Sequence, residues 1–166
     1  MGVFKNNKEK KFTYIVFAVY LMLLCWLVLF KFAVSVDLIP HLRGINMIPF
    51  HYDKASPVHM REVIFNIIVF IPAGVYFTTL FSKKNILLGV AGTAILSLLF
   101  EVVQYVFAIG SSDITDLITN TIGGLCGMVL FWVIFKITDK YKMTIINSIG
   151  SVIEIFAIFI LFITFL

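Results

Sequence analysis

The stretch FEVVQYVFAIGSSDITD, residues 100–116, decides how the sequence is interpreted, because it places Glu101 and Gln104 inside an otherwise almost wholly apolar segment. The chain has 166 residues, of which 61% are hydrophobic and 13% are charged. Soluble domains are about 45–50% apolar and about 25% charged, so this composition predicts a protein of the lipid bilayer. A carboxylate at the centre of a membrane helix costs about 2.5–3.5 kcal/mol, so Glu101 should face a protein interior or a wet cavity.

Five apolar runs extend on either side of that stretch, each near the roughly 20 residues that a helix needs to cross a hydrocarbon core. The runs are residues 12–33, 62–81, 86–109, 116–135 and 145–166, and residues 35–60 form the longest connection. We therefore predict an all-α fold, a polytopic integral membrane helical bundle built as a single domain of residues 1–166. Cys25 and Cys126 lie in apolar runs, where a thiol behaves as a small hydrophobe, so we predict neither a disulfide nor a zinc site.

The placement of the basic residues sets the expected orientation. If the helices alternate, nine lysines fall on one side of the membrane: Lys5, Lys8, Lys10, Lys11, Lys83, Lys84, Lys136, Lys140 and Lys142. The other side holds Arg43, Lys54 and Arg61. Because positive charge accumulates on the cytoplasmic side, we predict a cytoplasmic N-terminus and an extracytoplasmic C-terminus.

Polar side chains on three helices reach a common depth in this orientation. They are Asn66, Glu101, Gln104, Asp116 and Asn120. Glu101, for example, lies about 12 Å below the outer end of its helix. We predict that these five side chains line one outward-facing polar cavity that binds a ligand, with Arg61 as a further ligand-binding residue. The alternative is that they only join helices, through hydrogen bonds worth roughly 0.6–2 kcal/mol each.

The fourth run begins DITDLITNTIGGLCGMV, residues 113–129. Gly123 and Gly127 are four residues apart, a spacing that lets another helix backbone approach closely. Asp113 suits a helix cap, since its carboxylate can accept backbone N–H groups at the positive end of the helix dipole. For Asp113 and Asp116 the alternative is a catalytic role beside Glu101.

The connection at residues 35–60 contains the stretch NMIPFHYD, residues 46–53, which is too apolar for a solvated linker. We predict that it lies against the membrane interface or over the mouth of the bundle. The connection also holds His41, His51 and His59 with Asp37 and Asp53. Their spacing matches no helical pair of metal ligands, so we predict no metal site.

Two further features lie within the apolar runs. Pro72, in the second run, removes a backbone hydrogen bond, and it is either a functional hinge or an ordinary transmembrane proline. In the last run, Asn147, Ser151 and Glu154 recur at helical spacing. Glu154 either packs against the Gly123 and Gly127 groove or contacts a second copy in a homo-oligomer.

Four blocks together resemble the VanZ family of bacterial membrane proteins: NMIPF at 46–50, NIIVFIPAG at 66–74, EVVQ at 101–104 and DITDLITNTIGG at 113–124. The resemblance implies a protein of the bacterial cytoplasmic membrane that is involved in resistance to glycopeptide antibiotics, notably teicoplanin. Members of the family often carry an arginine shortly before the aspartate that matches Asp113, whereas residues 108–112 here read AIGSS. Any anion-binding role therefore falls on Arg43, Lys54 or Arg61.

Three classes of function follow. The first is a binding module whose polar cavity holds an envelope lipid, a lipid-linked cell-wall intermediate or the lipid tail of a lipoglycopeptide. The second is an intramembrane enzyme with Glu101 as general base and Asp116 or Asp113 as its partner, since paired carboxylates can perform acid–base chemistry. The third is a non-catalytic partner of envelope machinery. We favour the binding module, because the sequence contains no nucleophile motif, HExxH or phosphate-binding loop, and we expect no cofactor and no nucleic-acid partner.

Overall fold

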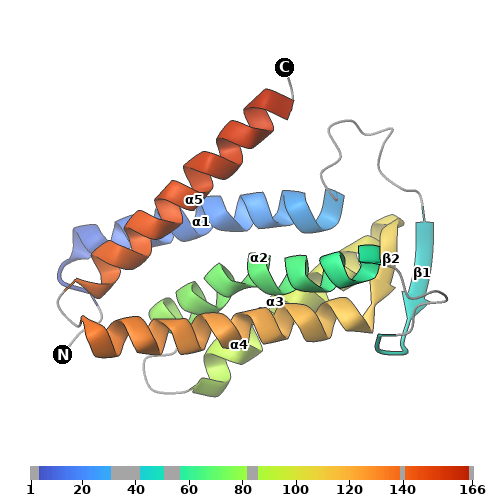
Figure 1. Cartoon of the computed structure of the whole chain (residues 1–166), viewed down its shortest axis with the longest axis horizontal. Helices are drawn as coiled ribbons and strands as arrows, with labels where there is room; N and C mark the ends of the chain where they lie inside the picture. Colours follow the sequence, from blue (N-terminus) through green and yellow to red (C-terminus); the bar gives the residue numbers. More distant parts are fainter. Residues whose placement is uncertain (1–3, 31–41, 51–56, 82–85, 139–140, 165–166) are drawn as a thin grey trace. The chain divides into compact units, whose positions relative to one another are not determined.

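The computed structural model describes residues 4–30, 42–50, 57–81, 86–138 and 141–164. In chain order the elements are α1 (Asn7–Phe30), β1 (Leu42–Asn46), α2 (Pro57–Phe81), α3 (Ile86–Phe107), β2 (Ile109–Asp113), α4 (Ile114–Ile137) and α5 (Lys142–Thr164) (Figure 1). Five helices among the described residues are long and apolar enough to cross a membrane. The prediction of a helical protein with five such segments is confirmed.

Local capping explains where the helices begin and end. The side chain of Asn6 accepts the N–H of Glu9 at 2.8 Å, so α1 begins at Asn7, within the polar segment that precedes the predicted run. In turn, α3 stops at Phe107 because Ala108 adopts a left-handed φ of 53°. The side-chain oxygens of Asp113 then start α4 at Ile114, as described below.

The two strands are a feature that the sequence analysis does not predict. β1 pairs in parallel with β2, in a register that runs from Leu42 opposite Ile109 to Asn46 opposite Asp113. Both strands are short and contain glycine or serine, which leaves little of the alternating β-branched pattern that indicates a strand. They lie side by side at the end of α3 and the start of α4 (Figure 1). Part of the connection at residues 35–60 is thereby fixed to the α3–α4 junction.

The chain divides into two compact units: Met1–Leu38 with Trp132–Leu166, and Ile39–Phe131. In the first unit, α1 and α5 contact each other near their starts and diverge toward their ends (Figure 1). The contact includes a hydrogen bond in which Asn147 Nδ2 donates to Thr13 Oγ1 at 2.9 Å. The single membrane domain stays a prediction.

In the second unit, glycines let α4 lie directly against its neighbours. A Cβ atom at Gly123 or Gly127 would collide with the backbone of α2, at the carbonyl of Ile67 or of Ile71. The predicted close approach of another helix at these glycines is therefore confirmed. Packing in this groove was one of two predicted placements of Glu154. Because the backbone of α2 fills the groove, no room is left there for that side chain.

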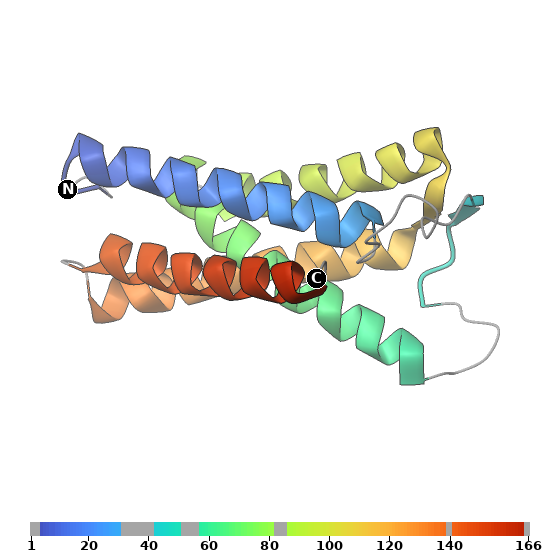
Figure 2. The ribbon, with the colours of Figure 1, turned by 90° about the horizontal axis from the view of Figure 1, so that it is seen from above.

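The same unit is held on its other faces by side-chain packing. A Cβ atom at Gly124 would collide with the side chain of Thr93 in α3, so α4 also lies close to α3. The rings of Phe70 in α2 and Phe100 in α3 meet edge to face with their centroids 6.2 Å apart. Pro72 lies inside α2 and does not end it. Figure 2 shows that α2 and α3 meet where α2 ends and α3 begins, and that they diverge toward the strands.

Candidate functional site

Glu101 is buried, with 6% of its surface exposed, in the last turns of α3. Its Oε2 atom accepts the backbone N–H of Asp113 at 2.8 Å. Its backbone carbonyl accepts the hydroxyl of Ser112 at 2.6 Å. Together these two hydrogen bonds hold β2 and the start of α4 against α3.

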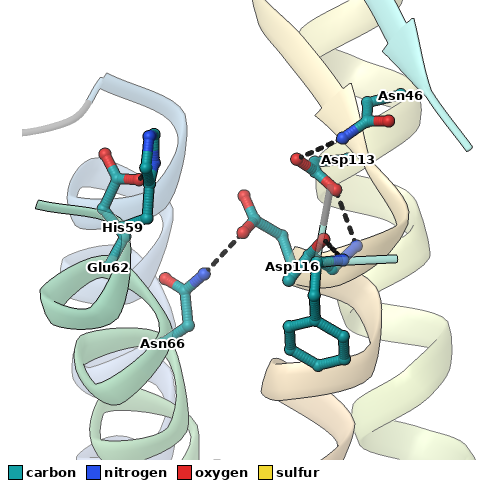
Figure 3. Close-up of polar contacts among 8 residues, drawn as sticks. Asn46, His59, Glu62, Asn66, Asp113 and Asp116 are labelled. Atoms are coloured by element: carbon teal, nitrogen blue, oxygen red, sulfur yellow. Dashed lines mark hydrogen bonds and ion pairs between the residues drawn. The ribbon is translucent and has the colours of Figure 1, made fainter. Parts of the chain in front are cut away.

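Asp113 caps α4 and also ties it to the β1 segment. Its Oδ1 atom accepts the N–H of Thr115 at 2.7 Å, which is the bond that a helix cap makes. Its Oδ2 atom accepts a hydrogen bond from Nδ2 of Asn46 at 3.1 Å, as Figure 3 shows. The predicted capping role of Asp113 is confirmed.

The turn after β1 is fixed by two further hydrogen bonds. Oδ1 of Asn46 accepts the N–H of Ile48 at 3.1 Å, and the hydroxyl of Thr115 accepts the N–H of Phe50 at 3.0 Å. Phe50 itself has a left-handed φ of 55°. Sequence reasoning gave Asn46 and Thr115 no role, although Asn46 begins the NMIPF block and Thr115 lies inside the DITD block. Their signal was that both blocks contain small polar residues suited to turns and caps.

Apolar side chains of this anchored segment are turned outward. Those of Ile45, Met47, Ile48 and Phe50 are each more than half exposed. An outward cluster of this kind is typical of a segment at a membrane interface or beside a ligand. Contact of the segment with the membrane or the mouth of the bundle stays a prediction.

The remaining residues predicted for the cavity form separate pairs between helices. Nδ2 of Asn66 in α2 donates to Oδ1 of Asp116 in α4 at 2.8 Å (Figure 3). Nδ2 of Asn120 in α4 donates to the hydroxyl of Ser97 in α3 at 2.9 Å. Interhelical bonds of this kind join helices, which was the alternative to a cavity.

The last two predicted ligand-binding residues lie in different surroundings. Gln104 is buried, and its side chain packs against Gly110, where an added Cβ atom would lie 3.4 Å from Nε2. Arg61 is exposed on α2. The ligand-binding role of each of these residues stays a prediction.

An open pocket of about 350 Å³ lies beside Glu101, between α3, the start of α4 and the β1 segment. Of the five residues predicted to line a cavity, Glu101 lines this pocket, and Asp113 and Asn46 join it there. The other lining side chains are mostly apolar, among them Leu98 and Leu117. The acidic residues that line the pocket are thus Glu101 and Asp113, whereas the carboxylate of Asp116 bonds to Asn66.

Arg43, which the sequence analysis considered only for anion binding, lies next to the pocket. Nη2 of Arg43 donates to the carbonyl of Val106 at 3.1 Å, in the last turn of α3. Its guanidinium also lies over the ring of Tyr105, 5.5 Å from the ring centroid, and Tyr105 lines the pocket. The cation thereby meets the negative end of the α3 dipole.

His59 is not among the residues that line this pocket. His59 Nδ1 is 3.4 Å from Oε2 of Glu62 at the start of α2 (Figure 3). Outside the described residues lie His41, His51, Asp37, Asp53 and Lys54. Within the described ranges, no group of three or more histidine, cysteine, aspartate or glutamate residues could hold a metal ion.

In the first unit, one polar residue of α5, Asn147, makes a contact with α1, whereas no contact is assigned to the carboxylate of Glu154. Asn147 is buried and bonds to Thr13, as described above. Glu154 is also buried, and Ser151 is half-buried. A role for Glu154 in a homo-oligomer stays a prediction.

Comparison with known proteins identifies the family. Residues 17–136 match the model of the family described as VanZ/LLP1. The chain is also 40% identical to Protein VanZ of Enterococcus faecium over 128 residues, which cover 76% of this chain and 77% of that protein. No solved structure matches the chain. The extent of both sequence matches shows that this chain belongs to the VanZ/LLP1 family.

Proposed function

We propose that this protein lies in the bacterial cytoplasmic membrane and confers or modulates resistance to glycopeptide antibiotics such as teicoplanin. It does so by binding the acyl chain of an envelope lipid or of a lipoglycopeptide. The observation that carries the proposal is the open, largely apolar pocket beside Glu101. Membership of the VanZ/LLP1 family and five helices of membrane-spanning length support it.

The physical basis of binding is the shape of the pocket. Acyl chains of the bilayer are as apolar as leucine, so burial from water contributes little to association inside a membrane. Packing against a preformed pocket must then supply the selectivity. The walls of this pocket are mostly apolar and include Leu98 and Val102, and Glu101 and Asp113 are among its lining residues.

Binding is favoured over catalysis because both carboxylates already make structural hydrogen bonds. Glu101 accepts the N–H of Asp113, and Asp113 caps α4. The enzyme alternative rests on the fact that these same two carboxylates line one pocket. Turnover of a lipid-linked substrate by the purified protein, lost in Glu101→Gln, would select that alternative, whereas binding without turnover would select ours.

The direct test is the resistance phenotype of Glu101→Gln. The new amide oxygen can still accept the N–H of Asp113, so the variant should fold and be expressed normally while it lacks the carboxyl group. We expect the teicoplanin resistance that the protein confers on a susceptible host to fall toward that of the empty vector. Glu62→Gln, an exposed change on α2, is the matched control and should keep full resistance. Full resistance in Glu101→Gln would contradict the proposed role of the carboxylate.

The proposal includes the orientation inferred from the lysines, with a cytoplasmic N-terminus and an extracytoplasmic C-terminus. A phosphatase that is active only outside the cytoplasm should give signal when fused to the C-terminus. A fluorescent protein that folds only in the cytoplasm should stay dark in the same place. The opposite pattern would put the Glu101 pocket on the cytoplasmic side.

A further inference from the structure

Among the described residues, the accessible charge beside the pocket at Glu101 is a cation. Arg43, in β1, is exposed, whereas the side chain of Glu101 is buried and accepts the N–H of Asp113. Both carboxylate oxygens of Asp113 are also acceptors, one for the N–H of Thr115 and the other for the amide of Asn46. The acidic residues that line the pocket therefore already accept hydrogen bonds within the fold, and the guanidinium is the charge that a ligand meets.

The guanidinium keeps donors for such a ligand. Arginine carries five N–H donors, and Nη2 of Arg43 uses one of them for the carbonyl of Val106, at 3.1 Å. Within the described ranges, no carboxylate forms an ion pair with Arg43. Its planar fork matches the geometry of a phosphate, which it can bind through two parallel N–H···O bonds.

Two observations place the guanidinium at the edge of the pocket. It lies over the ring of Tyr105, 5.5 Å from the ring centroid, and Tyr105 lines the pocket. Ile45 lines the pocket too, and Arg43 precedes it by two residues in β1. The side chains of Arg43 and Ile45 therefore lie on the same face of the strand, about 7 Å apart along it. A phosphate joined to a chain in the pocket can reach Arg43 over that distance.

The guanidinium also lies at the depth expected for the phosphates of a bilayer. Val106, to which it is bonded, is the last residue but one of α3, and α3 is long and apolar enough to cross a membrane. The end of a spanning helix lies at the membrane interface, where tyrosine rings and arginine head groups are typical. From Tyr105 to Leu98 the pocket extends about 10 Å along α3, away from that end. A head group at Arg43 and an acyl chain toward Leu98 fit this arrangement.

We propose that the pocket beside Glu101 binds an envelope lipid whose head group is a phosphate. The phosphate lies at Arg43, and the acyl chain lies along Val102 and Leu98. The inference deepens the proposed function and rests on it for the location of the helices in a bilayer and for an acyl chain in the pocket. It adds the charge of the head group, and of the two ligands in the proposed function it selects the envelope lipid.

The preference for a phosphate can be measured with three amphiphiles that share one chain. Dodecyl phosphate, dodecanol and dodecylamine would compete with a dansyl-labelled dodecyl chain for the purified full-length protein in a neutral detergent. We expect dodecyl phosphate to bind about fivefold more tightly than dodecanol, which corresponds to the roughly 1 kcal/mol that an exposed ion pair can contribute. Dodecylamine should bind no more tightly than dodecanol. Equal affinity for the phosphate and the alcohol, or a preference for the amine, would overturn the assignment of the head group.

The role of Arg43 can be tested against another exposed cation, Lys136, in the last turn of α4. Arg43→Gln should remove the preference for dodecyl phosphate and leave the affinity for dodecanol unchanged, because the apolar walls remain. Arg43→Lys keeps the charge without the planar fork and should keep part of the preference. Lys136→Gln should keep all of it. Equal loss in Arg43→Gln and Lys136→Gln, or loss in Arg61→Gln alone, would overturn the assignment to Arg43.

A measurement on the unmodified protein covers the case in which Arg43→Gln does not fold. Because Arg43 is exposed, salt screens its attraction for a phosphate. The preference for dodecyl phosphate over dodecanol should therefore fall when NaCl is raised from about 0.05 M to about 1 M. A preference that salt leaves unchanged would overturn the role of an exposed cation.

Inorganic phosphate distinguishes a lipid head group from a free anion. It should fail to displace the dansyl probe at concentrations at which dodecyl phosphate displaces it, since it has no chain to occupy the pocket. Equal displacement by inorganic phosphate and dodecyl phosphate would overturn the lipid as the ligand.

The position of the chain can be tested with two residues of α3. Val102 is 49% exposed and lines the pocket, whereas Leu99 is 54% exposed and is not among the lining residues. Val102→Trp should abolish binding of all three amphiphiles, and Leu99→Trp should leave it unchanged. Equal weakening by the two substitutions would overturn the pocket as the site of the chain.

Failure of this inference can be told apart from failure of the proposed function. If dodecyl phosphate is preferred and Val102→Trp abolishes its binding but keeps teicoplanin resistance, the inference is supported and the proposed function is overturned. If Val102→Trp loses both binding and resistance while the phosphate and the alcohol bind equally, the inference is overturned and the proposed function is supported.

Discussion

Two regions of α4 are held in place by opposite means. Its first turn is fixed by directional hydrogen bonds, in which Asn46 donates to the carboxylate of Asp113 and the N–H of Asp113 donates to Glu101. Its middle, at Gly123 and Gly127, is fixed by the lack of side chains, which lets the backbone of α2 come into contact. The first arrangement positions chemical groups at the pocket, and the second sets the distance between helices. The two regions should therefore respond differently to substitution.

Gly127→Ala should have the largest effect on stability. Its Cβ atom would collide with the backbone carbonyl of Ile71, and backbone cannot move aside as a flexible side chain can. Overpacking of a core usually costs about 1–3 kcal/mol, and we expect the unfolding free energy in denaturing detergent to fall by about 3 kcal/mol. Gly110→Ala is the control, since its Cβ would lie 3.4 Å from Nε2 of Gln104, an ordinary contact. Equal stability of the two variants would show that α2 and α4 are not in backbone contact.

Asp113→Ala, at the hydrogen-bonded first turn of α4, should have the next largest effect on stability. It removes the cap on Thr115 and leaves the amide of Asn46 without its acceptor, so we expect a loss of about 2 kcal/mol. Asp113→Asn keeps an oxygen for the cap but loses the acceptor for Asn46, and should cost about half as much. Both are measured in the same unfolding assay. A loss as large in Asp113→Asn as in Asp113→Ala would mean that charge, rather than capping geometry, is what matters at this position.

The same contrast explains what could be predicted from sequence. The helical segments, the close approach at Gly123 and Gly127 and the cap at Asp113 follow from local patterns, and all three are found in the structure. The bond between Asn46 and Asp113 joins residues 67 positions apart, through a parallel pairing of two short strands. No local periodicity indicates such a pairing.

The hydrogen bond of the Glu101 side chain could not be predicted from the sequence for a different reason. The depth of this side chain in an apolar helix predicted burial, which the structure shows. Its partner is the backbone N–H of Asp113, and a backbone donor is present at every residue except proline, so it leaves no mark in the sequence. Equal depth also brought Asn66 and Asp116 into a single hydrogen bond, although depth alone could not distinguish a pair from a cavity.

A smaller effect is expected for the contact between α1 and α5, which includes the side-chain hydrogen bond between Asn147 and Thr13. Asn147→Leu and Thr13→Val each remove one partner of the bond, and the double variant removes both. Interhelical hydrogen bonds in membrane proteins average about 0.6 kcal/mol, so we expect a coupling energy of about that size from the four unfolding free energies. Additive single effects would show that the bond contributes nothing beyond packing.

The smallest effect, and the only stabilising one, is expected at Ala108, which joins α3 to β2. Its φ of 53° is a left-handed conformation that costs a residue with a Cβ atom about 1 kcal/mol or more relative to glycine. Glycine loses more backbone entropy on folding, and that loss offsets part of the gain. Ala108→Gly should therefore raise the unfolding free energy by about 0.5 kcal/mol. Ala91→Gly, inside α3, is the control of opposite sign and should lower it by about 1 kcal/mol, since helical φ gives glycine no advantage there. If Ala108→Gly is instead as destabilising as Ala91→Gly, α3 continues past Phe107 as helix. The turn that brings β2 into contact with Glu101 is then formed differently.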